Sequence, residues 1–231
     1  MELLQCKNIT KNYGDKEILK NINLTISSSK IIGLLGKNGT GKTTLIKLIN
    51  GLLTPTTGEI LVNGKPLGIE SKLSISYLPE RTYLDKSMTV NDTVKYFTEF
   101  YQNFNPEKAY KLLKDLNLDC NQKLQKMSKG MQEKVQLVLV MSREADLYIL
   151  DEPLGGVDPA TRDYILDTIL SNFKDGSSVL ISTHLISDIE RILDEVIFID
   201  SGKIILQEDA DTLRNKEKES IDEIFRRKFK C

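Results

Sequence analysis

The chain has 231 residues, of which 40% are hydrophobic and 28% are charged, and its formal net charge at pH 7 is −1. This composition excludes a disordered or fibrous protein, and the length is sufficient for one large domain with its own core. The near balance of 32 basic and 33 acidic residues argues against a surface built as a whole for nucleic acid.

Short apolar runs that alternate with helical patterns predict an α/β fold with a mostly parallel sheet, preceded by antiparallel strands. The region from about 85 to 142 holds a single glycine and many helix formers, which predicts a helical subdomain inserted into the core. In chain order we expect strands at 2–10 and 18–26 around a turn at 13–16, a strand at 30–35, a helix at 42–53, a strand at 58–63, the helical subdomain, and strands at 147–151, 178–183 and 195–200 separated by helices at about 160–173 and 185–193.

The C-terminal segment differs in composition, and we divide the chain into a core at 1–208 and a charged helical tail at 209–231. Residues 214–230 include seven basic and four acidic side chains, which is typical of a solvated terminal helix. Ile221, Ile224, Phe225 and Phe229 recur at helical spacing and form an apolar face. We expect this face to dock on the protein's own core rather than on lipid or a partner.

The cysteines and the N-terminal segment suggest a reducing compartment. Cys6, Cys120 and Cys231 are far apart, and the chain has only one histidine, which leaves too few candidates for a zinc site. We therefore expect three free thiols. The N-terminal residues lack the pattern of a signal peptide, and no apolar run approaches the about 20 residues of a membrane-spanning helix. Any action at a membrane is expected to pass through a partner.

Residues 36–43 read GKNGTGKT and match the phosphate-loop pattern G-x-x-x-x-G-K-[ST]. Glycines allow successive N–H groups to turn toward one anion, and the following helix adds partial positive charge at its N-terminus. Lys42 is of the type that reaches the β- and γ-phosphates, and the Thr43 hydroxyl is of the type that ligates magnesium. An apolar strand pattern precedes the loop and a helical pattern follows it. We therefore expect a nucleotide site that includes Gly36, Lys37, Asn38, Gly39, Thr40, Gly41, Lys42, Thr43 and Thr44.

Two carboxylates, Asp151 and Glu152, end the apolar segment that starts at 147. Asp151 is placed to hold magnesium, usually through water, and Glu152 is placed to polarise an attacking water. Phosphoryl transfer needs positioning, charge neutralisation and a base on the nucleophile. Together with the phosphate loop, this pair predicts a magnesium-dependent nucleoside triphosphatase.

These motifs resemble those of the ATP-binding subunits of ABC transporters, and the resemblance covers about residues 1–208. The segment MSKGMQ at 127–132 is similar to the family signature, with Ser128 and Gly130 at the expected places. In the family, this segment caps the nucleotide held by the opposite subunit. Lys129 and Met131 depart from the usual signature, and this variant is similar to one of bacterial exporter-type subunits that work with a separately encoded membrane protein.

Three further positions match the family in order and approximate spacing. Gly155-Gly156-Val157-Asp158 resembles the loop that crosses the dimer interface, and His184 resembles the switch histidine. Tyr13 lies 23 residues before Gly36 and resembles the aromatic residue that stacks on adenine. Glu80 stands where the family has a glutamine, and its carboxylate could accept a hydrogen bond from the attacking water or ligate magnesium.

The resemblance implies a mechanism as well as a fold. ATP and Mg²⁺ are the expected cofactors, and Lys42, Glu152 and His184 are the expected catalytic residues, with Thr43, Asp151 and Glu80 as metal ligands. Two subunits, identical or different, are expected to close head-to-tail on two ATP molecules. Each site then combines the catalytic residues of one subunit with Ser128 and Gly130 of the other.

The expected partner is a polytopic membrane permease, bound by the helical subdomain and the Glu80 loop. The variants of the family motifs favour an export system. The subunit itself is expected to be cytoplasmic, on the inner face of the membrane, and no nucleic acid is expected. A non-transport ABC ATPase that acts on ribosomes or nucleic acid is the alternative. It is disfavoured because the insert of about 60 residues is short for a coiled coil and because the chain holds one cassette. A small-molecule kinase is disfavoured by the carboxylate pair and the signature.

Overall fold

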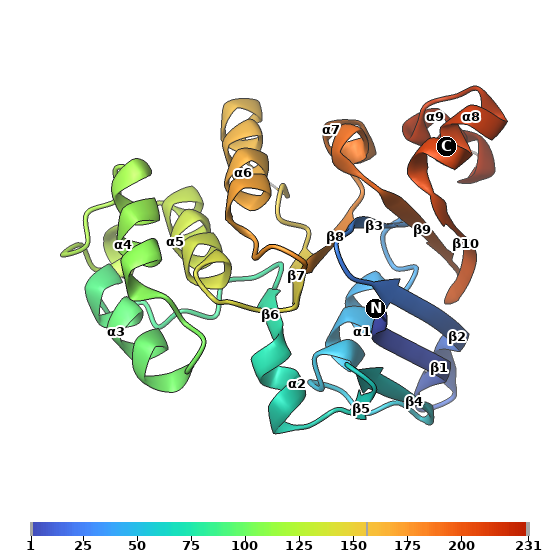
Figure 1. Ribbon diagram of the computed structural model, residues 1–231, viewed down its shortest axis with the longest axis horizontal. Coiled ribbons are helices and arrows are strands. Elements are labelled where there is room, and N and C mark those ends of the chain that lie inside the picture. The colour runs from blue at the N-terminus through green and yellow to red at the C-terminus, as the bar shows by residue number, and fades with distance from the viewer. Residues whose placement is uncertain (1, 156, 230–231) are drawn as a thin grey trace.

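Two sheets and the helix between them position the phosphate loop (Figure 1). A computed structural model describes residues 2–155 and 157–229, with the backbone alone for 159 and 160. Gly156 and Cys231, which the sequence analysis singled out, lie outside the described residues. The elements are β1 (Glu2–Tyr13), β2 (Lys16–Ser27), β3 (Ile31–Leu35), α1 (Lys42–Ile49), β4 (Thr57–Val62), β5 (Lys65–Pro66), α2 (Ile69–Ser74), β6 (Ile75–Leu78), α3 (Val90–Phe100), α4 (Pro106–Asp115), η1 (Leu124–Lys126), α5 (Lys129–Met141), β7 (Leu147–Asp151), α6 (Pro159–Asn172), β8 (Ser178–Thr183), α7 (Ile186–Ile189), η2 (Glu190–Ile192), β9 (Glu195–Asp200), β10 (Lys203–Asp209), α8 (Ala210–Glu217) and α9 (Ile221–Phe229).

The larger sheet has the strand order β10-β9-β3-β8-β7-β6, and the smaller sheet has the order β2-β1-β4-β5. All pairs of the larger sheet are parallel except β9–β10, and all pairs of the smaller sheet are antiparallel. The α/β class with a mostly parallel sheet and antiparallel N-terminal strands is therefore confirmed. The expected strands are present, and β1, β2 and β4 run longer or shift by one to three residues.

Both faces of the larger sheet are covered. In β3, Ile32 and Leu34 belong to a core shared with α1 and the smaller sheet, whereas Ile31 and Leu35 belong to the core under the other helices. All five residues of β3 are buried, as expected for a central parallel strand. This double cover explains why the strand is a continuous apolar run in the sequence rather than an alternating one.

The helical subdomain is formed by α3, α4 and α5, which lie together beyond β6 (Figure 1). Thr89, Asn105 and Ser128 each cap one of these helices by accepting a hydrogen bond from a backbone N–H of the first turn. The Phe97 ring contacts the rings of Tyr101 and Phe104, at centroid distances of 5.4 and 5.7 Å. The inserted helical subdomain is therefore confirmed.

Several short elements were not predicted. Strand β6 has four residues and β10 has a half-exposed face, so neither gives a strong apolar run. The helix expected at 42–53 ends at Ile49, because Gly51 adopts a positive φ of 65° just after it. The helix expected at 185–193 is divided into α7 and the 3₁₀ turn η2.

The C-terminal tail contains two helices rather than the one predicted at 214–230. Lys218 takes a left-handed φ of 59° and ends α8, and Ser220 and Glu223 then form reciprocal hydrogen bonds at the start of α9. The Ser-x-x-Glu pattern was the missed signal. The apolar face of α9 is buried against the core, as its helical spacing predicted, and Arg226, Arg227 and Lys228 on the charged face are exposed. The boundary at 208–209 stays a prediction.

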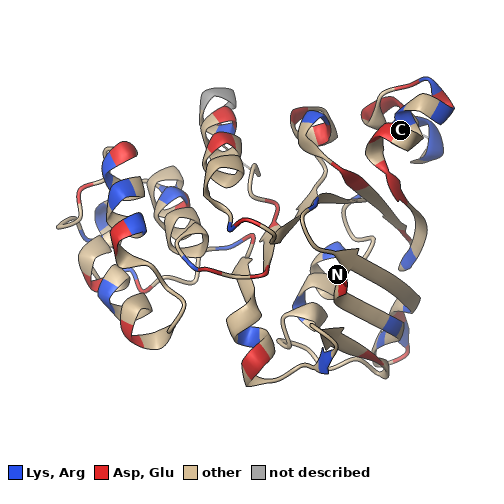
Figure 2. Ribbon diagram, viewed as in Figure 1, with Lys and Arg blue, Asp and Glu red and all other residues tan. Residues whose placement is uncertain are grey.

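The phenylalanines of α9 hold it on the larger sheet. The rings of Phe225 and Phe229 stack at 4.1 Å, and each meets the Phe198 ring of β9 edge-on. The charges of α9 also complement its dipole, with acidic residues in the first turn and Arg226, Arg227 and Lys228 in the last turn (Figure 2).

Two smaller expectations concern thiols and membrane spans. Cys6 and Cys120 are free cysteines, and burial raises the pKa of Cys6 to about 12. No helix within residues 2–155 and 157–229 has the length and apolar character needed to cross a bilayer.

We predict that Ile224→Ala lowers the free energy of unfolding by about 2–5 kcal/mol, because it opens a cavity under α9. Ile224 is fully buried, whereas Ile205 on β10 is 50% exposed. The matched control Ile205→Ala should change the free energy of unfolding by no more than about 0.5 kcal/mol. Urea unfolding of both variants measures this difference. Equal effects would show that α9 does not contribute to the core.

Candidate functional site

The phosphate loop joins the end of β3 to the start of α1, as the sequence predicts. Two of its glycines are required by the geometry. A Cβ on Gly36 would lie 2.5 Å from the carbonyl oxygen of Ile199, and Gly41 has a φ of 110° that side chains rarely allow. The loop therefore lies directly on β9, and its backbone turns sharply into α1.

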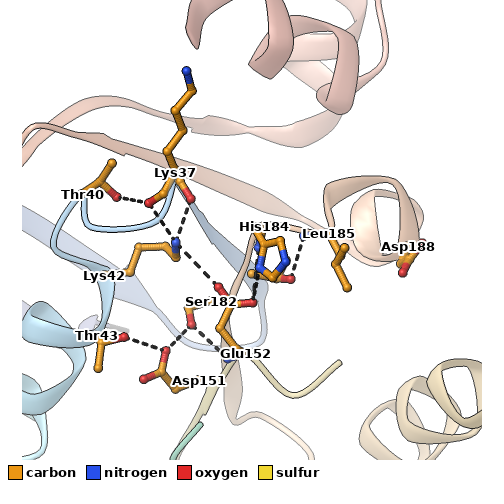
Figure 3. A network of polar contacts seen from close by, with 12 residues as sticks. Lys37, Thr40, Lys42, Thr43, Asp151, Glu152, Ser182, His184, Leu185 and Asp188 are labelled. Atoms are coloured by element: carbon orange, nitrogen blue, oxygen red, sulfur yellow. Dashed lines mark hydrogen bonds and ion pairs between the residues drawn. The ribbon is translucent and has the colours of Figure 1, made fainter. Parts of the chain in front are cut away.

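Lys42 extends back over the loop that it follows. Its side chain is 6% exposed, and its Nζ donates to the carbonyl oxygens of Gly36 and Lys37 at 2.7 and 3.2 Å (Figure 3). The Oε1 atom of Glu152 lies 3.6 Å from the same nitrogen. Burial lowers the pKa of Lys42, while the nearby carboxylates of Glu152 and Asp151 oppose that shift. A phosphate entering the loop would meet a positioned ammonium group.

Asp151 ends β7 at the bottom of the site and is 1% exposed. Its Oδ1 accepts hydrogen bonds from the hydroxyls of Ser182, at 2.5 Å, and of Thr43, at 3.5 Å. Its Oδ2 is buried and has no hydrogen-bond partner among the described residues. Burial raises the pKa of Asp151, and the charges of Glu152 and Glu80 raise it further.

This arrangement fits a magnesium ion. A buried carboxylate oxygen without a partner, beside a threonine hydroxyl, supplies the oxygen ligands that Mg²⁺ takes in nucleotide sites. In the part of the chain that the structure describes, no group of three His, Cys, Asp or Glu residues could hold a metal ion alone. Phosphate oxygens and water would therefore have to supply the remaining ligands, which is the usual mode for Mg²⁺.

Glu152 links the phosphate loop to the end of β8. Its backbone has a positive φ of 51°, which is rare for a residue with a side chain and is typical of functional sites. The backbone N–H of Glu152 donates to the carbonyl oxygen of Ser182 at 3.0 Å, which holds this conformation. Its Oε2 lies 2.9 Å from Nδ1 of His184, so Lys42, Glu152 and His184 form a continuous polar chain (Figure 3).

An open cleft of about 1200 Å³ lies next to the polar contacts of Lys42, Glu152 and His184. Tyr13 lines the cleft with an exposed ring, and Lys11 places its Nζ 5.2 Å from the centre of that ring. Glu80 also lines it, on the side of the helical subdomain. The structure therefore brings both predicted residues to the phosphate loop, and Glu80 as a metal ligand stays a prediction. The other predicted residues that line the cleft are Asn38, Gly39, Gly41, Lys42, Thr43, Thr44, Glu152 and His184.

The signature segment reaches this cleft only through Lys129 and Gln132 among the described residues. Ser128 caps α5 by accepting a hydrogen bond from the N–H of Met131, and a Cβ on Gly130 would meet open space. Lys129 lines the cleft, but Ser128 and Gly130 are not among the described residues that do so. The predicted interface loop continues from Glu152, and Asp158 caps α6. Within that loop, Gly156 is outside the described residues.

Ser182 is the main residue that sequence reasoning missed. Its hydroxyl donates to the Asp151 carboxylate and accepts a hydrogen bond from the backbone N–H of Glu152 at 3.2 Å, so it fixes the carboxylate of Asp151 and the backbone of Glu152. Nothing in the segment SVLIST marks this serine as different from a strand residue. Only the pairing of β7 with β8, which places Asp151 opposite Ser182, reveals the contact.

The chain is similar to known proteins over most of its length. The ABC transporter family matches residues 19–155. The ABC-type transporter ATP-binding protein EcsA of Bacillus subtilis (strain 168) is 34% identical over 215 residues, which cover 88% of this chain and 86% of that protein. The lantibiotic transport ATP-binding protein SrtF of Streptococcus pyogenes is 31% identical over 93% of this chain and 94% of its own length. The SkfA peptide export ATP-binding protein SkfE of Bacillus subtilis (strain 168) is 31% identical over 89% of this chain and 88% of its own length.

Solved structures agree with this relationship. An ATP-binding subunit of an ABC transporter superposes with a TM-score of 0.88 at 28% identity, over 96% of this chain and 98% of that one. The ATP-binding cassette MJ0796, described as a dimer in a post-hydrolysis state with ADP and Pi, superposes with a TM-score of 0.78 at 24% identity, over 90% of this chain and 98% of that one. The second likeness concerns the fold alone.

We predict that Asp151→Asn raises the melting temperature of the chain at pH 7 in the absence of nucleotide and metal. Because burial raises the pKa of Asp151, its ionised form is destabilising when the chain is folded. The penalty is complete above the raised pKa and is absent below about pH 4, where the carboxyl is protonated in both states. The rise in melting temperature that Asp151→Asn causes should therefore become smaller as the pH falls toward 4.

Thermal unfolding with ATP and Mg²⁺ completes this test. At a ligand concentration about 100 times the Kd, the free energy of unfolding of the wild type should rise by about 2.7 kcal/mol. In Asp151→Asn, most of this ligand-dependent rise should be absent. Asp175→Asn, at an exposed turn, is the matched control and should behave as the wild type. A variant that melts earlier at pH 7 without ligand yet keeps the full gain would contradict the assignment.

Proposed function

Because the chain belongs to the ABC transporter family, as an ATP-binding subunit with the family's ATPase domain, we propose that two such subunits close head-to-tail on two ATP molecules and drive a separate membrane permease. The observation that carries the proposal is the polar chain of Lys42, Glu152 and His184 above the buried Asp151. It places a cation, a carboxylate and an imidazole around one point at the phosphate loop.

In this proposal, the residues of one subunit bind the phosphates and move a proton. Lys42 and the loop N–H groups bind the β- and γ-phosphates, and Thr43 and Asp151 would hold Mg²⁺, which neutralises phosphate charge when bound. Glu152 orients a water molecule and takes its proton as the water oxygen attacks the γ-phosphorus, and ADP leaves. His184 holds the carboxylate of Glu152 in place through the contact at 2.9 Å. Glu80 faces the same region and could orient the water or join the metal ligands.

The position of the signature supports a second subunit. Ser128 is exposed apart from its capping bond to the N–H of Met131, and outside its own helix no atom of the described residues would lie within 4 Å of a Cβ on Gly130. A nucleotide held by a partner subunit could reach both. The cassette MJ0796, which has the same fold, is described as a dimer. The pair is proposed as either two copies of this chain or this chain with a related one.

A groove between the helical subdomain and the α1–α2 region supports a membrane partner. This groove, which we call the apolar groove, includes exposed apolar residues of α2, α3 and the adjoining loops, has a volume of about 670 Å³ and adjoins the nucleotide cleft, with which it shares Arg81. Its charged lining residues are Lys47, Lys72, Arg81 and Arg143, without a described carboxylate. Exposed apolar surface of this kind marks protein–protein contact. We propose that a short cytoplasmic helix of the permease occupies it, on the inner face of the membrane.

Export is the proposed direction. The relatives SrtF and SkfE are named for lantibiotic transport and for peptide export, and each matches this chain over nearly its whole length. The signature departures Lys129 and Met131 and the carboxylate at Glu80 are in agreement with an exporter-type subunit. The transported molecule would be selected by the permease rather than by this chain.

We predict that Glu152→Gln binds ATP, forms a stable pair and hydrolyses ATP about 10²–10⁴ times more slowly, because the amide cannot take the proton of water. Steady-state phosphate release and size-exclusion chromatography with ATP measure the two effects. Glu99→Gln makes the same substitution at an exposed position of α3 and should leave both unchanged. Hydrolysis by Glu152→Gln at the wild-type rate would remove Glu152 as the base.

The permease proposal predicts that Ile69→Glu and Phe100→Glu weaken membrane association without lowering hydrolysis by the free subunit. Ile69 is 83% exposed and Phe100 is 65% exposed, and both line the apolar groove, so a carboxylate there would be desolvated by the partner. Each substitution is added to Glu152→Gln, and proteins recovered with the ATP-bound pair from detergent-solubilised native membranes are compared by mass spectrometry.

Ile205→Glu is the control, since Ile205 is similarly exposed but lies on β10, outside the groove. A polytopic membrane protein should accompany Glu152→Gln and its Ile205→Glu form in near-equal amount, and the groove variants should lose it. Recovery of ribosomal or nucleic-acid-binding proteins in its place would favour the non-transport alternative.

A further inference from the structure

The phosphate loop is supported from behind by the C-terminal part of the chain. The N–H of Gly202, in the turn between β9 and β10, donates to the carbonyl oxygen of Thr40 at 3.1 Å. Gly36 approaches Ile199 of β9 so closely that a Cβ would not fit. Residues near 200 therefore set the position of a loop near 40, which makes the C-terminal elements part of the site's framework.

Lys37 adds a contact between the same loop and α9. Its side chain points away from the nucleotide site, toward the C-terminal helices, although the sequence places it within the phosphate loop (Figure 3). Its Nζ donates to the carbonyl oxygen of Phe229 at 2.7 Å. This carbonyl lies at the C-terminal end of α9, where the helix dipole concentrates negative charge, and a lysine ammonium there is stabilising.

The backbone of Lys37 acts on the opposite side, within the site. Its carbonyl oxygen accepts hydrogen bonds from the hydroxyl of Thr40, at 2.9 Å, and from the Nζ of Lys42, at 3.2 Å. One residue thus connects the end of α9 to the cation that is proposed to bind phosphate. A shift of Lys37 would move the oxygen on which Lys42 rests.

The other end of this connection is held firmly. Phe225 and Phe229 pack on Phe198 of β9, and Phe198 is paired in register with Leu35, which directly precedes the loop. Arg227 also forms ion pairs with Glu217 and Glu219, which tie α9 to the end of α8. The Phe229 carbonyl is therefore a fixed point relative to the strand that carries the loop.

We propose that Lys37 is a positioning residue through which α9 holds the phosphate loop in its nucleotide-binding conformation. The inference rests on the proposed nucleotide site and adds that the C-terminal helix tunes nucleotide affinity without touching the nucleotide. Binding is the quantity affected, since a loop held in shape loses less freedom when phosphate binds. Asp151 and Glu152 lie on and after β7, whose neighbours in the sheet are β6 and β8, so turnover of bound ATP should change little.

The test compares Lys37→Met and Lys37→Arg with the wild type, using titration with ATP for Kd and steady-state hydrolysis for KM and kcat. A fivefold rise in Kd corresponds to about 1 kcal/mol of lost preorganisation, which is part of what one charge-assisted hydrogen bond can supply. We expect Lys37→Met to raise Kd and KM by that factor at nearly constant kcat. Lys37→Arg should stay within about twofold of the wild type, because arginine can still donate to the carbonyl.

A second substitution tests whether the effect runs through α9. Lys228→Pro breaks the last turn of α9 and displaces the Phe229 carbonyl, whereas Lys228→Ala changes the same exposed residue and keeps the helix. In the Lys228→Pro background, Lys37→Met should change Kd by less than about twofold, and in the Lys228→Ala background it should keep its full effect. Thermal unfolding checks that each variant is folded, and if Lys228→Pro is not, the Lys37→Met and Lys37→Arg pair decides alone.

The proposal would be overturned by an unchanged Kd in Lys37→Met, whether or not kcat falls, or by an equal effect of Lys37→Met in the proline background. Tighter binding by Lys37→Met would also overturn it, because α9 would then restrain the loop. A wild-type chain that does not bind ATP would instead overturn the nucleotide site itself. The two failures are therefore distinguishable.

Discussion

The buried ammonium of Lys42 is the constraint on which the rest of the site depends. A charge that is nearly removed from water must be surrounded by oxygen atoms, because its desolvation is otherwise strongly unfavourable. The chain supplies those oxygens from two places, the carbonyls of residues 36 and 37 and the carboxylate of Glu152. The loop must therefore fold back over its own lysine, and the end of β7 must lie close to the end of β3.

The strand order satisfies this requirement. Strand β8 lies between β3 and β7, so the carboxyl ends of all three meet at one edge of the sheet, which is where open α/β sheets bind ligands. Ser182 and His184 leave β8 at this edge and contact the two carboxylates from between the neighbouring strands. The same order makes β9 the other neighbour of β3, so the support behind the loop comes from the C-terminal part of the chain.

The parts of the site that could be predicted from the sequence are those whose chemistry is local. Gly36–Thr43 and the pair Asp151–Glu152 each follow a strand within a few residues, so a linear pattern contains the whole feature. Ser182 and the anchoring of Lys37 by α9 could not be predicted, because each depends on residues 30 to 192 positions apart that meet only through sheet pairing and helix docking. Strand β6 was missed because four residues between a helix and a loop give no periodicity. The division of the tail was missed because the left-handed Lys218 has no sequence mark and the Ser-x-x-Glu pattern after it was not used.

The distribution of charge explains why such a site should require a divalent cation. The carboxylates of Glu152, Asp151 and Glu80 all act on the ammonium of Lys42, and burial raises the pKa of Asp151, with the charges of Glu152 and Glu80 raising it further. The cleft lining also carries the exposed cations Lys16, Arg81, Lys86 and Lys129, together with Glu133. An anion is therefore attracted to the rim but repelled at depth unless a cation accompanies it. Because glutamine would be neutral at position 80, we expect the carboxylate of Glu80 to strengthen the dependence of nucleotide binding on a divalent cation.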